Sequence, residues 1–216
     1  MKKIRSLLSF AVMILLALGS DEIFASSQST VKLQGEITPS SCDIGMNSAG
    51  SIKLNPNTGQ GSIRSGKMFL PEKKLGLIIQ CQGATSFAFR ARDIAPNAGN
   101  VQLAGEQQRD IFSLGLTNKG HAIGGYLALI DSEHSRMDGR VIPNVLVSDN
   151  EGVSWRSGQF RLTPSGESIY SWGSQTTPGS ARQVNIDIIL KPFIFSLSQA
   201  DSIKLDGMTT FEIVYL

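Results

Sequence analysis

The sequence predicts an all-β protein, folded as a two-sheet sandwich or a barrel. Apolar and polar residues alternate with a period of two in several short segments, as half-buried strands do. Glycine, proline, asparagine and serine residues, which favour turns, separate these segments. Beyond the first 25 residues, no long apolar stripe has the spacing of a helix. These three observations favour short strands joined by turns.

The first 25 residues have the pattern of a secretory signal peptide. The basic head contains Lys2, Lys3 and Arg5. The apolar run that follows, residues 7–18, is shorter than the roughly 20 residues that a membrane span needs, so we expect no membrane insertion. We predict that residues 1–25 are removed after Ala25, or alternatively that cleavage follows Gly19, and that the mature chain is exported.

The charge of the mature chain argues against two classes of partner. Removal of residues 1–25 takes away three basic and two acidic side chains, so the formal net charge falls from +2 to +1. Without a dense basic face, we expect neither nucleic acid nor an anionic membrane surface as a partner. No low-complexity linker divides residues 26–216, which we predict to form a single β-sandwich domain with a short N-terminal extension.

Cys42 and Cys81 are the only cysteines in the chain. Export delivers them to an oxidising compartment, where such a pair normally bonds. A redox-active or metal-binding pair would favour C-x-x-C spacing or nearby histidines, and the sequence has neither. We therefore predict a structural disulfide between Cys42 and Cys81.

The first predicted strand covers residues 31–37 and ends at Pro39, because proline cannot donate to a strand ladder. One face of this strand carries Val31, Leu33, Gly35 and Ile37. A second, short strand is expected at 51–54, before a loop rich in glycine, asparagine and serine at 56–66.

Two adjacent strands are predicted at 75–81 and 87–92, joined by a turn at Gly83. The region 95–180 is more irregular. Alternation resumes there in four stretches, which are 112–116, 123–130, 145–147 and 160–162.

Residues 183–190 show the clearest alternation in the chain, and we expect Pro192 to end this strand. The residues predicted to point inward are Val184, Ile186, Ile188 and Leu190.

The stretch Thr209–Leu216 also alternates, with Phe211, Ile213 and Tyr215 on its apolar face. Thr210, Glu212 and Val214 lie on the other face. Since loose chain ends are usually polar, we expect this apolar strand to be held in a sheet.

The sequence contains no recognisable catalytic set, so we predict a protein that is not an enzyme and that needs no cofactor or metal. Asp131, Glu133 and His134 are the best metal candidates, but we interpret this run as a solvated loop. Trp155 and Trp172 are candidate platforms for a sugar, although buried core tryptophans are commoner in sandwiches.

In the order of these features, the chain resembles the pilin subunits that Gram-negative bacteria assemble by the chaperone–usher pathway. The carrying motifs are the Gly35-Glu36-Ile37 step before Cys42, the distance to Cys81, and a closing apolar strand with Tyr215 as the penultimate residue. Two departures place the chain in a divergent or minor-subunit branch. Ile203 stands where pilins often carry a glycine, with Gly207 nearer the end, and the chain is longer than many major pilins.

The resemblance implies an incomplete immunoglobulin-like β-sandwich that lacks its last strand and is completed by a donated one. The implied partners are a periplasmic pilus chaperone, an outer-membrane usher and neighbouring fimbrial subunits. The product would be a fimbrium on the cell surface that supports adhesion. The strand expected to pair with the chaperone carries Phe211, Ile213, Tyr215 and Leu216, the last through its carboxylate.

The donated strand would come from the N-terminal extension of the next subunit. If cleavage follows Ala25, only residues 26–30 precede the first predicted strand, so its face with Val31, Leu33, Gly35 and Ile37 is a candidate donor. Two alternatives remain. One is a glycan-binding tip adhesin, and the other is a self-complete secreted β-sandwich without any polymer.

Overall fold

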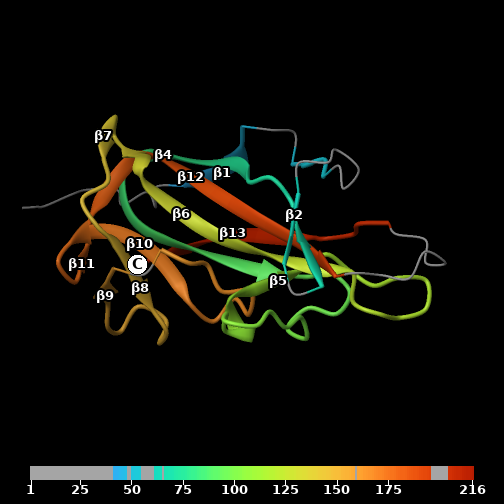
Figure 1. Ribbon diagram of the computed structural model, residues 1–216. Helices are drawn as coiled ribbons and strands as arrows, with labels where there is room; N and C mark the ends of the chain where they lie inside the picture. The colour runs from blue at the N-terminus through green and yellow to red at the C-terminus, as the bar shows by residue number, and fades with distance from the viewer. Residues whose placement is uncertain (1–40, 48–49, 55–60, 65, 159, 196–203) are drawn as a thin grey trace, which may run out of the picture. The chain divides into compact units, whose positions relative to one another are not determined.

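The structure is a computed structural model that describes residues 41–47, 50–54, 61–64, 66–158, 160–195 and 204–216 (Figure 1). All of them belong to one unit, Pro39–Leu216. The predicted signal peptide and the strand predicted at 31–37 lie outside the described residues.

The described residues form thirteen strands and one short 3-10 helix, η1 (Gln108–Asp110). The strands are β1 (Cys42–Met46), β2 (Ser62–Arg64), β3 (Lys67–Phe69), β4 (Lys73–Asp93), β5 (Ile111–Ser113), β6 (Gly124–Met137), β7 (Arg140–Val141), β8 (Val145–Ser148), β9 (Arg156–Ser157), β10 (Ile169–Ser174), β11 (Thr177–Pro178), β12 (Ser180–Phe195) and β13 (Thr209–Tyr215). The all-β prediction is confirmed.

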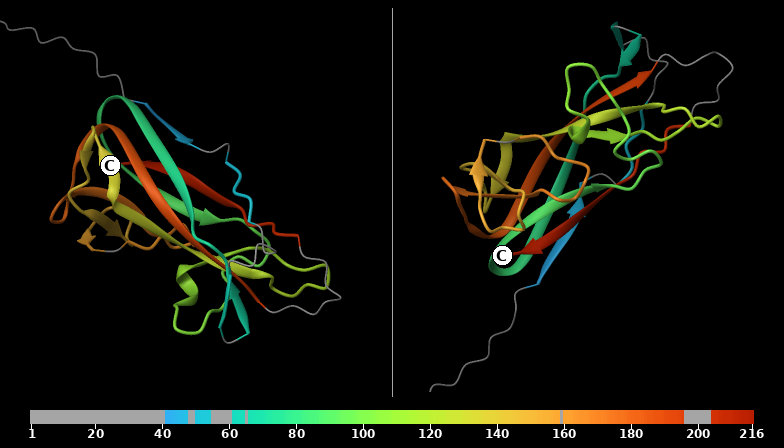
Figure 2. Two further views of the ribbon diagram at one scale, coloured as in Figure 1. Left: turned by 45° about the horizontal axis from the view of Figure 1, so that its top comes forward. Right: turned by 90° about the horizontal axis from the view of Figure 1, so that it is seen from below.

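The long strand β4 connects two antiparallel ladders (Figure 2). The first half of β4 pairs with β1 on one side and with β12 on the other, and β12 continues to β6. The second half pairs with β13 and, at Phe89, with Tyr170 of β10, which continues to β8. Each half of β4 therefore belongs to a different ladder.

Side chains from both ladders pack into the same core. Leu77 and Ile79 come from the first half of β4, and Phe87 from the second half packs edge-on against Trp172 of β10, with ring centroids 4.9 Å apart. Val184, Ile186 and Ile188 of β12 are buried as predicted, and Leu190 packs against them while remaining partly exposed. The two ladders thus enclose one hydrophobic interior.

Residues 75–81 and 87–92 belong to the single strand β4, but this strand folds over between its two halves (Figures 1 and 2), so the change of direction predicted at Gly83 is present within a strand rather than in a separate turn. Thr85 and Ser86 pair with residues at the start of β12, and the register of this pairing shifts by three residues between Gln80 and Thr85, so Gly83 lies in an irregular part of the ladder. A glycine inside a strand often marks a tight bend of this kind.

The strand break predicted at Pro192 is also wrong, because β12 continues to Phe195. The carbonyl of Pro192 accepts the N–H of Leu70 at 2.9 Å. Since the nitrogen and the carbonyl of one strand residue point to the same edge, the missing N–H of Pro192 faces the break between β3 and β4. The proline therefore lacks only one bond, the reciprocal hydrogen bond to Leu70 just beyond the end of β3.

Residues 51–54 form no strand, and the predicted loop at 56–66 contains the whole of β2. The short apolar alternation of Ile52 and Leu54 has a different origin. Both side chains are partly buried and pack against the hydrophobic core, while Ser51 and Lys53 are exposed.

Candidate functional site

Strand β13 has one edge without a partner among the described residues, because it pairs only with β4. The N–H of Leu216 donates to Ser86 at 3.2 Å, and the carbonyl of Met208 accepts the N–H of Ile94 at 2.9 Å. Successive residues of a strand direct their backbone groups to opposite edges. The residues whose backbone groups face the free edge are therefore Thr209, Phe211, Ile213 and Tyr215.

Strand β1 has a similar free edge within the described part of the chain. Ser41 and Asn47 make backbone hydrogen bonds toward β4, to Gln82 and Gly76 respectively, both at 3.0 Å. The same alternation directs the backbone groups of Cys42, Ile44 and Met46 to the other edge. The N–H of Cys42 donates to the hydroxyl of Tyr215 at 2.9 Å, so the two free edges meet at this end.

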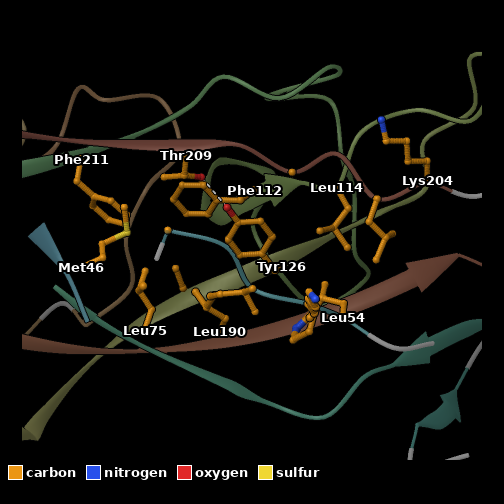
Figure 3. Close-up of a pocket in the computed structure, with 17 residues that line it drawn as sticks. Met46, Leu54, Leu75, Phe112, Leu114, Tyr126, Leu190, Lys204, Thr209 and Phe211 are labelled. Atoms are coloured by element: carbon orange, nitrogen blue, oxygen red, sulfur yellow. Dashed lines mark hydrogen bonds between the residues drawn. The ribbon is translucent and has the colours of Figure 1, made fainter. Parts of the chain in front are cut away.

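An apolar groove of about 550 Å³ begins beyond this contact and lies between the two edges (Figure 3). The wall on the β1 side includes Met46, Ile52 and Leu54, and the wall on the β13 side includes Leu205, Gly207, Thr209 and Phe211. The floor consists of side chains from β4, β5, β6 and β12 and the residues beside them, which are Leu75, Phe112, Leu114, Tyr126, Ala128, Leu190 and Pro192. Apolar side chains of the interior are thus accessible along the groove between β1 and β13.

One polar contact crosses the floor of the groove. The hydroxyls of Tyr126 in β6 and Thr209 in β13 lie 2.5 Å apart and form a hydrogen bond, which Figure 3 shows as a dashed line. The ring of Tyr126 stacks on Phe112, with centroids 5.1 Å apart and 15° between the planes. Burial raises the pKa of Tyr126, so its hydroxyl stays protonated throughout the physiological range.

Removing this hydrogen bond with Tyr126→Phe is expected to lower the free energy of unfolding by about 0.5–1.5 kcal/mol, the usual net value of one such bond. Urea denaturation measures the change. In the Tyr126→Phe background, Thr209→Val should cost less than it does alone, because the bond is already absent. Strictly additive costs would show that the two hydroxyls do not interact.

Asp93 fixes the far end of the groove floor. Its buried carboxylate accepts the N–H groups of Ala95 at 3.0 Å and of Ser113 at 2.6 Å, and so joins the end of β4 to β5. Burial raises the pKa of Asp93, and the two N–H donors act in the opposite direction. This anchor positions Phe112 and Leu114, which flank Ser113 in the floor.

The rim of the groove carries charges. Lys53 and Lys204 lie among its lining residues, both exposed, and Figure 3 shows Lys204 at the end near Leu54 and Leu114. Glu212 lies exposed on the outer face of β13, opposite Arg90 of β4. Arg90 instead forms an ion pair with Glu151 at 2.9 Å, and no ion pair involves Glu212 within the described ranges.

The side chains of the predicted chaperone-pairing strand differ in their surroundings. Phe211 and Ile213 pack against the core, whereas Tyr215 is 53% exposed and Leu216 is 47% exposed. The apolar face predicted for Tyr215 is therefore only partly correct, because its hydroxyl reaches the edge of β1 and holds the ring near solvent. The candidate donor residues Val31, Leu33, Gly35 and Ile37 lie outside the described residues.

The predicted disulfide is present. Cys42 and Cys81 are bonded, and they lie directly opposite each other in the pairing of β1 with β4. The bond ties the beginning of β1 to the central strand, beside the closed end of the groove. No free cysteine occurs among the described residues.

The two tryptophans occupy different environments. Trp172 is 2% exposed and packs in the core, so it cannot stack on a sugar. Trp155 is half-buried and follows β8. Of the two candidate platforms, only Trp155 has an accessible ring surface.

The loop predicted around Asp131, Glu133 and His134 is wrong, because all three residues lie in β6. A bulge brings Asp131 and His134 together, with 2.8 Å between the carboxylate Oδ2 and the imidazole Nδ1. This hydrogen bond is the main cause of the lowered pKa of Asp131. Within the described part of the chain, no group of three or more His, Cys, Asp or Glu side chains is arranged to hold a metal.

Within the part of the chain that the structure describes, these features define an all-β fold with an apolar groove between the edges of β1 and β13. No protein-family model matches the chain, and no curated protein matches it. None of the helices in the described residues is long and apolar enough to cross a membrane.

Proposed function

We propose that this protein is a structural subunit of a bacterial surface fimbria, exported through the periplasm. In this proposal it is an incomplete immunoglobulin-like sandwich, and a strand from another chain fills the groove between β1 and β13. The observation that carries the proposal is the groove itself. It joins an apolar floor to two strand edges that pair with no further strand among the described residues, which is the combination that strand addition requires.

The chemistry of the groove requires a partner during export. Exposed strand edges beside an apolar surface promote aggregation, so the chain needs a substitute strand before assembly. A periplasmic chaperone would supply that strand, and an outer-membrane usher would exchange it for the strand of a neighbouring subunit. The fimbria would then support adhesion of the cell.

The segment with Val31, Leu33, Gly35 and Ile37 is the donor that fits best. Its seven residues extend about 20 Å at roughly 3.3 Å per residue. The wall from Leu205 to Phe211 also comprises seven residues, so an extended donor and this wall match in length. The donor's period of two presents apolar side chains to the groove and polar ones to water.

The two alternative functions have less support. A glycan-binding adhesin loses one of its two candidate platforms, because Trp172 is buried. A self-complete sandwich has no use for an apolar groove flanked by unpaired edges.

A synthetic peptide that copies residues 28–40 tests the proposal. We expect the protein refolded with this peptide to bind it and to unfold at a higher temperature, because binding to the folded state alone stabilises that state. A control peptide with Leu33→Asp and Ile37→Asp should have no effect. Equal behaviour of both peptides at saturating concentration would refute the groove as a strand acceptor.

Deletion in the full chain supplies the second readout. Removing residues 31–37 should abolish polymers on the cell surface, whereas removing residues 26–30 should leave them intact. Normal polymers after the first deletion would exclude residues 31–37 as the donor.

A further inference from the structure

We propose that a second surface site, on the far side of β6 from the groove, binds a neutral carbohydrate. Two hollows of about 710 and 530 Å³ lie beside the segment of residues 94–107, which connects β4 to η1. Gly105 and Glu106 line both hollows, and we call the two hollows together the outer site. Their volumes are typical of small-molecule sites. The outer site involves neither tryptophan, and it does not depend on strand donation.

The outer site and the groove lie on opposite faces of the sheet. Ala128 of β6 lines the groove, whereas the next residue, Leu129, lines the outer site. In β12, Pro192 lines the groove and Phe195 lines the outer site. Successive side chains of a strand point to opposite faces, and the register between β6 and β12 is unbroken over residues 124–131. A strand bound in the groove therefore leaves the outer site open.

Packing fixes the segment that forms the outer site. Val101 is fully buried, and Leu103 is partly buried, in an apolar cluster with Phe193 of β12. The N–H of Glu106 donates to the carbonyl of Leu103 at 3.0 Å, which closes a turn. The site is therefore formed before a ligand arrives, and this lowers the entropic cost of binding.

The charges in the smaller hollow balance. Arg161 forms ion pairs with Glu106 and, at 3.7 Å, with Asp110. The Nε of Arg109 lies 4.0 Å from the same Asp110 carboxylate. Two cations thus face two carboxylates, so the hollow attracts neither anions nor cations strongly.

These ion pairs leave hydrogen-bonding groups unused. Arg161 makes both contacts through Nη1, so its Nε and Nη2 take no part in them. Glu106 uses Oε2 and keeps Oε1 as an acceptor. Oδ1 of Asp110 has no hydrogen-bond partner among the described residues. Donors and acceptors thus lie side by side, which suits sugar hydroxyls, since each hydroxyl both donates and accepts.

The larger hollow adds uncharged polar groups beside apolar ones. Asn100, Gln102 and Gln108 line it together with Leu103 and Phe195. Side-chain amides donate and accept as hydroxyls do, and apolar side chains cover the C–H faces of a sugar ring. A neutral carbohydrate presents both kinds of surface.

A carbohydrate of two or more units can occupy both hollows. They meet at Gly105, where an added Cβ would find no atom within 4 Å, so no bulk separates them. In a fimbria the site would recur in every subunit, and weak affinities would then act together.

An oligosaccharide array tests the proposal. The mature chain is joined in fours through biotin and streptavidin, so that weak sites act together. It is applied to neutral oligosaccharides, to their sialylated counterparts and to a set of unrelated peptides. We expect retention on neutral oligosaccharides that sialylation does not strengthen. Retention on no oligosaccharide, on peptides alone, or more strongly on the sialylated forms would overturn the proposal.

Substitutions locate the binding on the protein. Glu106→Gln and Arg161→Lys should each weaken binding of the best retained neutral oligosaccharide at least tenfold, as expected for hydrogen bonds to charged groups. Glu72→Gln is the matched control. It removes a carboxylate from another surface ion pair, with Lys191 at 3.0 Å, and should leave binding unchanged.

Gln102→Ala separates loss of contact from loss of folding. Gln102 is exposed, so its truncation should leave the melting temperature unchanged and weaken binding about threefold, as one neutral hydrogen bond would. Full binding in Glu106→Gln, Arg161→Lys and Gln102→Ala would overturn the outer site. Lower melting temperatures of the two charge variants, together with full binding in Gln102→Ala, would also overturn it, because folding rather than contact would then govern binding.

Discussion

Ile213→Asp is expected to abolish both binding of the donor peptide and recovery of the folded protein from the periplasm. The side chain of Ile213 packs against the core beside the free edge of β13. A carboxylate at this position must lose most of its water without gaining a partner, which costs several kcal/mol. That loss is comparable with the whole stability of an ordinary domain.

Position-matched variants show whether the facing of the side chain matters. Thr210→Asp introduces the same charge on the outer face of β13, opposite Arg92, and should leave recovery and binding unchanged. Glu212→Gln should also preserve folding. Tyr215→Asp should cost less than Ile213→Asp, since Tyr215 is 53% exposed. Similar losses for Ile213→Asp and Thr210→Asp would show that β13 does not border an apolar groove.

Removal of the disulfide by Cys42→Ala and Cys81→Ala is expected to lower the free energy of unfolding by about 3–4 kcal/mol, because the bond closes a long loop in the unfolded chain. The two cysteines are 39 positions apart in the sequence. The loss should concentrate in β1, because among the described residues this strand pairs only with β4, and the bond fixes its first residue there.

Urea denaturation of the oxidised protein, the reduced protein and the double alanine variant measures this cost. The last two should agree, since both lack the bond. Donor-peptide binding should weaken in parallel, because β1 forms one wall of the groove. A loss below about 1 kcal/mol would contradict the value expected from loop entropy. It would show that strand pairing alone holds β1 in place.

The sequence by itself determined the all-β class, the disulfide and the inward face of the 183–190 segment. Each of these is a local or chemical property. Alternation with a period of two reports which side of a strand is buried, and each of two cysteines in a chain has only one possible partner within it. The facing of Phe211 and Ile213 could be predicted for the same reason.

Only the tertiary structure decided which strands are continuous and where the core stays open. The residues around Gly83 and Pro192 have the composition of breaks, yet β4 bends through the first without ending and β12 continues through the second beside the end of β3. The groove depends on residues far apart in the chain, such as Met46, Tyr126 and Gly207, which no local pattern links. A strand edge is open when no other strand pairs with it. Which strands pair depends on contacts between distant parts of the chain rather than on local sequence.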